Sequence, residues 1–167
     1  LLNDLEAEVN SSCGLHVHID SRHLDENEVI VMGQKFNQFL PILGLMVPKS
    51  RTKNRYCAMS VSELDGCRYH AVNLTAFEKY RTIEIRLHSS TTSFQKISNW
   101  IKILSKIVSS EVEPSSRIDK VSDFCTALKL DADLQNYVVS RTQKFQGTAE
   151  ETPCESQVET AEDTLVA

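Results

Sequence analysis

Two short segments of this chain alternate strictly between apolar and polar residues. They are residues 15–20, LHVHID, and residues 83–88, IEIRLH. Successive side chains of a β-strand point to opposite faces, so each segment predicts a half-buried strand. The fold must therefore contain a sheet with one apolar and one polar face. The polar positions are His16, His18 and Asp20 in the first segment, and Glu84, Arg86 and His88 in the second.

Other parts of the chain show helical periodicity. The apolar positions Val29, Met32, Phe36, Phe39 and Leu43 recur at steps of three and four and predict a helix over 25–43. A helix capped by Thr92 or Ser93 is expected to bury Phe94, Ile97, Ile101, Leu104 and Val108. We also expect the end of a helix within 1–10, two helices near 117–130 and 131–145, and strands at 56–59, 67–77 and 81–90.

These elements predict an α+β fold in which antiparallel strands carry polar residues on one face and helices cover the other. Residues 1–145 are expected to form one core domain. Residues 146–167 carry acidic side chains and no basic ones, with few large apolar residues, and are expected to form a disordered tail.

The charge distribution and the cysteines exclude several classes of protein. The net charge of -5 comes from the acidic segment, which leaves the rest of the chain near neutral and without a basic stripe for nucleic acid. No apolar run is long enough to span a membrane. The scattered cysteines indicate reduced thiols in a cytoplasmic protein, with a Cys57–Cys67 bridge across a hairpin as the alternative.

The two polar strand faces carry residue types that bind metals and phosphates. Two imidazoles on one face of a strand can converge on a metal ion. A glutamate supplies charge to a hard cation, and an arginine two residues later can hold phosphate oxygens in a bidentate way. The alternatives are a solvent-facing histidine pair and a cross-strand ion pair.

Several segments resemble the glutamine synthetase-like superfamily of carboxylate–amine ligases. GLHVHID (14–20) resembles its Gly-x-His-x-His motif, and TIEIRLHSSTT (82–92) resembles its Glu-x-Arg strand. VPKSRTKNRYC (47–57), RYHAVNL (68–74) and the helix that contains Trp100 are similar to the amidoligase family in particular. The resemblance implies a curved antiparallel sheet whose concave polar face forms an active-site funnel.

The resemblance also implies a reaction, namely ATP-dependent amide bond formation through an acyl phosphate. Its substrates would be a small-molecule or peptide carboxylate and an amine, and its cofactors ATP and Mg²⁺ or Mn²⁺. By position, the resemblance implies that His16 and Glu84 are metal ligands and that His18 and Arg86 bind phosphate groups. It also implies that Arg51 and Asn54 lie on a loop bordering the phosphates or the substrate, and that Asn73 lines the funnel.

The sequence departs from the superfamily pattern in one respect. A Glu-x-Glu metal-binding strand is expected upstream of the His-x-His strand, whereas Glu6 and Glu8 lie in a predicted helix. The chain is therefore either an N-terminally incomplete copy, which its start at Leu1 favours, or a degenerate copy that acts as a protein-interaction module. A metal-dependent hydrolase is a third alternative, because such enzymes also carry His-x-His on a strand of a barrel.

Overall fold

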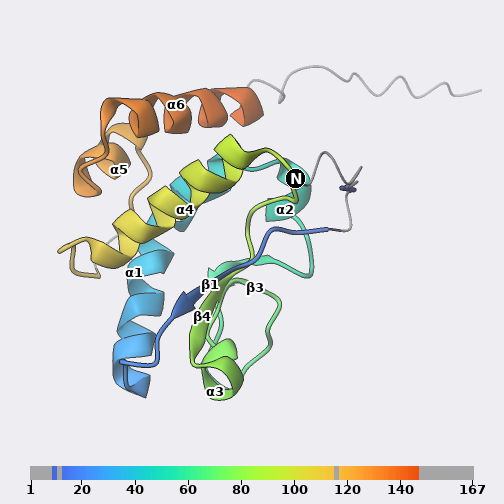
Figure 1. Ribbon diagram of the computed structural model, residues 1–167, viewed down its shortest axis with the longest axis vertical. Coiled ribbons are helices and arrows are strands. Elements are labelled where there is room, and N and C mark those ends of the chain that lie inside the picture. Colours follow the sequence, from blue (N-terminus) through green and yellow to red (C-terminus); the bar gives the residue numbers. More distant parts are fainter. Residues whose placement is uncertain (1–8, 11–12, 115–116, 147–167) are drawn as a thin grey trace, which may run out of the picture.

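The computed structural model describes residues 9–10, 13–114 and 117–146 (Figure 1). Its strands are β1 (Val17–Asp20), β2 (Ala58–Val61), β3 (His70–Asn73) and β4 (Thr82–Ile85). Its helices are α1 (Glu26–Leu45), α2 (Lys49–Thr52), α3 (Ala76–Tyr80), α4 (Phe94–Ser109), α5 (Val121–Ala127) and α6 (Ala132–Gln146). The α+β class predicted from the sequence is confirmed.

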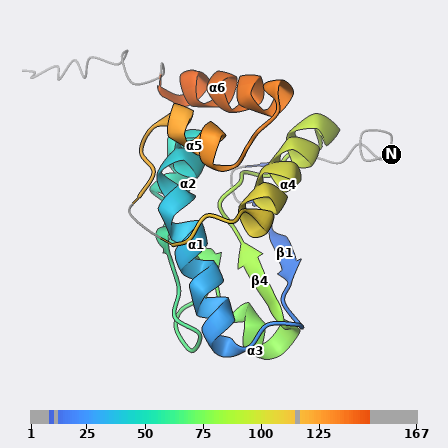
Figure 2. The ribbon, with the colours of Figure 1, turned by 90° about the vertical axis from the view of Figure 1, so that its left-hand side faces the viewer.

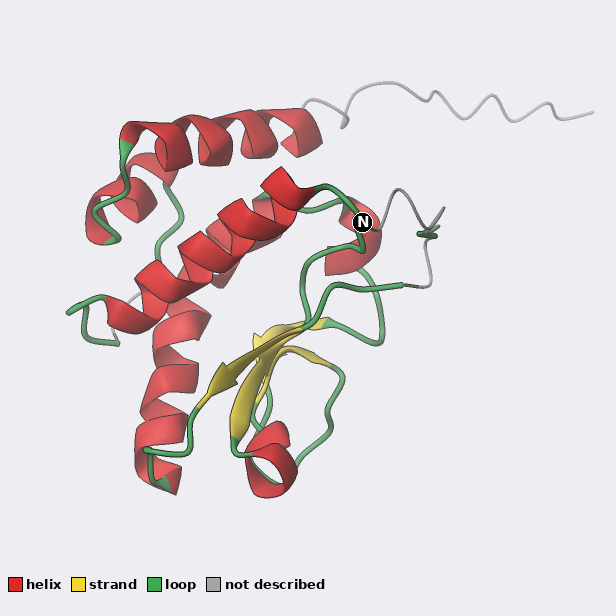
Figure 3. Ribbon diagram, in the orientation of Figure 1, coloured by secondary structure: helices red, strands yellow, loops and turns green. Residues whose placement is uncertain are grey.

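The strands form one open sheet in the order β1-β4-β3-β2 (Figure 3). β4 pairs antiparallel with β1 on one side and with β3 on the other. β2 pairs with β3 in parallel, so the prediction of a wholly antiparallel sheet is wrong at this edge. The loop 62–69 returns the chain to the end at which β2 began, whereas a hairpin would have reversed its direction. An open sheet of mixed direction also differs from the closed parallel barrel that the hydrolase alternative requires.

The strands are shorter than the sequence predicts, and local hydrogen bonds explain one of the ends. The side-chain oxygen of Asn73 accepts hydrogen bonds from the backbone N–H of Thr75 at 3.1 Å and from its hydroxyl at 2.7 Å. This turn ends β3 and leads into α3, where a strand reaching residue 77 was expected. β4 likewise ends at Ile85, although the alternating pattern continues to His88.

Helix α1 begins with a capping box and runs past the predicted end. The Asp25 carboxylate accepts a hydrogen bond from the Glu28 N–H at 2.9 Å, and the Glu28 carboxylate accepts one from the Asp25 N–H at 2.8 Å. Pro41 lies inside the helix and removes one backbone donor, yet the helix continues to Leu45. The residues that follow Pro41 are buried, so packing compensates for the lost hydrogen bond.

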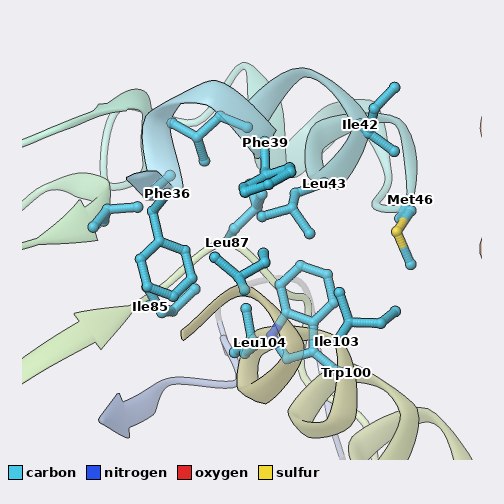
Figure 4. Close-up of a cluster of buried hydrophobic side chains, with 14 of the residues drawn as sticks. Phe36, Phe39, Ile42, Leu43, Met46, Ile85, Leu87, Trp100, Ile103 and Leu104 are labelled. Atoms are coloured by element: carbon cyan, nitrogen blue, oxygen red, sulfur yellow. The ribbon is translucent and has the colours of Figure 1, made fainter. Parts of the chain in front are cut away.

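The hydrophobic core lies between the apolar face of the sheet and helices α1 and α4 (Figure 4). Buried side chains from three places converge there: Phe36, Phe39 and Leu43 of α1, Ile85 and Leu87 of β4 and the residues after it, and Trp100, Ile103 and Leu104 of α4. Because Ile83 and Ile85 point into this core, Glu84 between them points to the opposite face of the sheet.

The buried stripe of helix α4 shares Leu104 with the predicted one and otherwise differs from it. Phe94 is 82% exposed and Ile101 is 43% exposed, although both were expected in the core. The buried residues of α4 are Trp100, Ile103, Leu104 and Ile107. Steps of three and four fit both stripes, and the contacts of α4 with α1 and α6 decide between them. The predicted helices near 117–130 and 131–145 correspond to α5 and α6, and α6 lies at the end of the molecule opposite α3 (Figure 2).

Some predictions fall outside the described residues, namely most of the helix end expected within 1–10 and all but Gln146 of the acidic segment. Within the described ranges, no helix combines the length and the apolar character needed to cross a membrane. Cys57 and Cys67 are free thiols, the first buried and the second exposed, so the alternative bridge between them does not form.

Candidate functional site

Three strands bring polar residues into one row on the face of the sheet away from the core. His18 of β1 lies opposite Glu84 of β4, and Glu84 lies opposite Asn73 of β3. His16 and Arg86 lie just beyond the ends of β1 and β4, two residues from His18 and Glu84. The alternation that predicted the two strands therefore also places these residues on the same face.

The Glu84 carboxylate is the centre of this row. Its Oε1 lies 2.8 Å from Nδ1 of His16, 2.9 Å from Nη1 of Arg86 and 3.7 Å from Nε2 of His18. Its Oε2 accepts a hydrogen bond of 2.7 Å from the Asn73 side-chain amide. Of the residues expected at the funnel, His16, His18, Asn73, Glu84 and Arg86 are thus brought together.

The environment of Glu84 keeps it ionised. Burial by itself raises the pKa of this carboxyl group, because only 8% of the side chain is exposed. The hydrogen bonds from His16 and Asn73 and the charge and hydrogen bond of Arg86 outweigh burial and lower the pKa to about 2. A permanent negative charge therefore sits on the polar face, and Arg86 balances it.

Glu84 and its partners line a pocket of about 760 Å³. His18, with a side chain that is 43% exposed, contacts the Thr82 hydroxyl through Nδ1 at 2.9 Å and meets the Tyr80 ring edge-on. Other residues that were not predicted from the sequence also line the pocket: Arg68, Thr75, Lys79, Tyr80 and Thr82. Thr82 lies two positions before Glu84, so the alternation of β4 contains a signal for it. Arg68 lies in the loop before β3, and Thr75, Lys79 and Tyr80 lie at the start of α3 or within it, outside that alternation.

Arg51 and Asn54, both expected on a loop that borders the phosphates or the substrate, do not line this pocket. Arg51 is 7% exposed, and its guanidinium donates hydrogen bonds to the backbone carbonyls of Arg86 at 2.6 Å and of Leu87 at 3.2 Å. Asn54 accepts a hydrogen bond from the Tyr56 N–H at 2.8 Å and closes a turn. Arg51 thus fixes the backbone just after β4 and, through that backbone, the position of Arg86.

Gly14 provides the space in which Arg51 and His16 approach each other. A Cβ atom at this position would lie 3.0 Å from Nη2 of Arg51 and 3.1 Å from Nε2 of His16. Any larger residue would press on both side chains. Packing against Arg51 and His16 therefore requires a glycine at position 14, before the two histidines of GLHVHID.

His88 and Asp20 belong to the polar positions of the two strands but not to the pocket lining. His88 is 1% exposed, and its ring centroid lies 4.9 Å from that of Trp100. Burial lowers the pKa of His88 to about 4, so the ring is neutral at pH 7. Asp20 forms an exposed ion pair of 2.7 Å with Arg22.

Residues 43–108 contain most of this site. This segment matches the model of the family described as "Putative amidoligase enzyme". The resemblance to amidoligases is confirmed over this range, which is less than half of the chain and includes Asn73, Glu84 and Arg86 but not His16 and His18. No curated protein and no solved structure matches the chain.

The amidoligase resemblance implies a magnesium or manganese ion, and the donor atoms near Glu84 test that expectation. Mg²⁺ prefers six oxygen ligands in octahedral geometry. The pocket offers one carboxylate, already engaged by Arg86, Asn73 and His16, and the described residues contain no group of three or more His, Cys, Asp or Glu placed to hold a metal. These residues alone do not fit a magnesium site, and we derive no step of a reaction through a metal.

Proposed function

We propose that this chain carries part of the active site of an ATP-dependent carboxylate–amine ligase. The observation that carries the proposal is the Glu84–Arg86 pair on a pocket wall within the segment that matches the amidoligase family. The substrates would be a small-molecule or peptide carboxylate and an amine. ATP as the cosubstrate and a cytoplasmic location, both expected from the sequence, are parts of the same proposal.

The reaction would have two steps. An oxygen of the substrate carboxylate bonds to the γ-phosphorus of ATP, the bond from that phosphorus to the β,γ-bridging oxygen breaks, and ADP leaves. The amine nitrogen then attacks the acyl carbon, the bond from that carbon to the phosphate oxygen breaks, and phosphate departs while the amine gives up a proton to solvent. Every reactant except the amine is anionic, so positioning and electrostatic stabilisation are the main tasks of the protein.

The pocket residues suit these tasks. Arg86 is oriented by Glu84 on one side, its guanidinium lies 6.0 Å from the centre of the Tyr69 ring, and Arg51 fixes its backbone. A guanidinium fixed in this way can face a phosphoryl group without reorganising during the reaction. The imidazoles of His16 and His18 lie in the same row beside Glu84 and line the same pocket.

Nucleotide binding by the Glu84→Gln variant tests the proposal. The wild-type chain is titrated with ATP in the presence of Mg²⁺ or Mn²⁺, and binding is followed by calorimetry. Loss of the charge that orients Arg86 is expected to weaken ATP binding by about tenfold or more, which corresponds to about 1.4 kcal/mol. Glu111→Gln is the matched control, because Glu111 forms an exposed ion pair with Lys129 outside the pocket.

Two results would overturn the proposal. One is that the wild-type chain does not bind ATP with either metal ion, in which case the alternative of a non-enzymatic interaction module gains support. The other is that Glu84→Gln binds ATP as well as Glu111→Gln does. ADP release that depends on both a carboxylate and an amine would extend the result from binding to catalysis.

A further inference from the structure

The pocket contains more positive charge than its own residues neutralise. Arg86 pairs with Glu84 at 2.9 Å, and Glu84 is the only carboxylate among the described residues that line the pocket. Arg68 and Lys79 line the same pocket, and within the described ranges neither side chain forms an ion pair with a carboxylate. Among the described lining residues, one carboxylate therefore accompanies three cationic groups, Arg68, Lys79 and Arg86.

Both cationic side chains lie against aromatic rings. The Arg68 guanidinium carbon lies 5.3 Å from the centre of the Tyr69 ring, and the Lys79 ammonium lies 5.0 Å from the centre of the Tyr80 ring. Cation–π contacts of this kind restrict a long side chain without consuming its charge. Arg68 precedes β3 and Lys79 lies in α3, so the two cations reach the pocket from separate elements.

The charge of Glu84 acts on Arg68, but Glu84 forms its ion pair with Arg86. Its two oxygens are already taken by His16, Arg86 and Asn73 at distances of 2.7 to 2.9 Å. A ligand that enters the pocket therefore meets the cationic groups of Arg68 and Lys79, of which Arg68 also forms a hydrogen bond with Tyr69. The hydroxyl groups of Thr75 and Thr82, which contact Asn73 and His18, lie in the same pocket. Donors of this kind select oxyanions, and two cations favour an anion with more than one charge.

We propose that Arg68 and Lys79 form an anion subsite that binds a multiply charged oxyanion group. This inference deepens the proposed ligase function and rests on it for the identity of the ligand. The oxyanion is either the polyphosphate of the nucleotide or a second carboxylate of the substrate. Both carry the same chemistry, and the two probes described below distinguish them.

The test uses probes that cannot react. Inorganic tripolyphosphate represents the nucleotide phosphates, and succinate, compared with acetate, represents a second substrate carboxylate. Binding of each to the full chain is measured by calorimetry without metal ions. Arg68→Gln and Lys79→Gln are each expected to weaken binding of the preferred probe about tenfold, and the double variant more, because each removes one charge-assisted contact.

Two residues of this chain provide matched controls. The Arg55 guanidinium lies 4.8 Å from the centre of the Tyr56 ring, and the Lys144 ammonium lies 5.8 Å from the centre of the Phe145 ring, but neither lines the pocket. Arg55→Gln and Lys144→Gln are expected to change binding less than twofold. Since all four side chains are at the surface, unchanged melting temperatures will show that the variants remain folded.

The outcomes separate this inference from the proposed function. Preference for tripolyphosphate assigns the subsite to the nucleotide, and preference for succinate over acetate assigns it to the substrate. The inference is overturned if neither probe binds, or if the pocket variants bind as well as the control variants. ATP binding that depends on Glu84 but not on Arg68 or Lys79 would overturn the subsite and leave the ligase proposal intact. If the chain does not bind ATP but binds a probe, and Arg68→Gln abolishes that binding, the subsite stands and the ligase proposal is overturned.

Discussion

Glu84 and His88 come from the same alternating segment but lie in different environments, one in the pocket wall and the other in the core. Glu84 lies on the pocket wall with its negative charge held by three neighbours, which lower its pKa to about 2. His88 lies behind the sheet against Trp100, where burial lowers its pKa to about 4 and keeps it uncharged at pH 7. The same pattern thus supplies a fixed charge to a pocket and a neutral polar group to the core.

The two arginines near these groups show the same contrast. Arg86 donates to a carboxylate and reaches the pocket, whereas Arg51 donates to two backbone carbonyls and is buried. A charge on the wall of a pocket can exchange its partner for a ligand. A charge that satisfies backbone carbonyls cannot leave them without exposing buried acceptors. We therefore assign Arg86 to ligand binding and Arg51 to the structure that supports it.

Arg51→Leu gives the largest expected effect on stability. The substitution leaves the carbonyls of Arg86 and Leu87 without their donor, and unsatisfied buried acceptors cost about 1–3 kcal/mol each. We expect the free energy of unfolding, measured by urea denaturation, to fall by about 2–4 kcal/mol. Lys53→Leu, at an exposed position just after α2, is the control and should leave it nearly unchanged. A loss below about 1 kcal/mol in Arg51→Leu would refute the supporting role.

The sequence predicted the centre of the candidate site because that centre depends on strand alternation alone. His16, His18, Glu84 and Arg86 share a face whether or not the lengths of the strands are known. The position of His88 depends on where β4 ends and on its contact with Trp100 of α4, a tertiary contact that no local pattern encodes.

The role of Arg51 and the lining residues of α3 could not be predicted from the sequence for a related reason. The carbonyls that Arg51 binds become available only after the chain leaves β4, so its partners depend on tertiary structure. Lys79 and Tyr80 belong to a short helix that follows a side-chain turn at Asn73, and only the first two residues of this helix fall within a predicted strand, 67–77. The exposed Phe94 illustrates the same limit in α4, because two helical stripes fit its sequence equally well.

His88 predicts how stability depends on pH. Burial, and then the charges of Arg141, Lys96 and Arg51, lower its pKa in the folded state from 6.5 to about 4, although its hydrogen bond with the Ser89 carbonyl acts in the opposite direction. Between these two values the unfolded state binds more protons, so stability falls as the pH drops from 6.5 to 4. The loss attributable to His88 is about 2–3 kcal/mol.

His88→Gln is expected to flatten this dependence. The free energy of unfolding of the variant, measured by urea denaturation at several pH values, should decline less than that of the wild type between pH 6.5 and 4. Packing changes lower stability at every pH and do not alter the slope. Parallel curves for the two proteins would show that His88 is already accessible to protons in the folded state.

His18→Ala gives the smallest expected effect on stability and the clearest separation of binding from folding. The side chain is 43% exposed, and it contacts Thr82 through one hydrogen bond, Tyr80 edge-on and Glu84 at 3.7 Å. Its removal should therefore change the free energy of unfolding by about 0.5 kcal/mol or less. Nucleotide binding should nevertheless weaken, because His18 lines the pocket. The control is His23→Ala, at an exposed turn outside the pocket, which should change neither nucleotide binding nor the free energy of unfolding. If His18→Ala instead destabilised the chain as strongly as Arg51→Leu, the distinction between a ligand-facing and a supporting set of polar residues would fail. The polar face of the sheet would then serve folding alone.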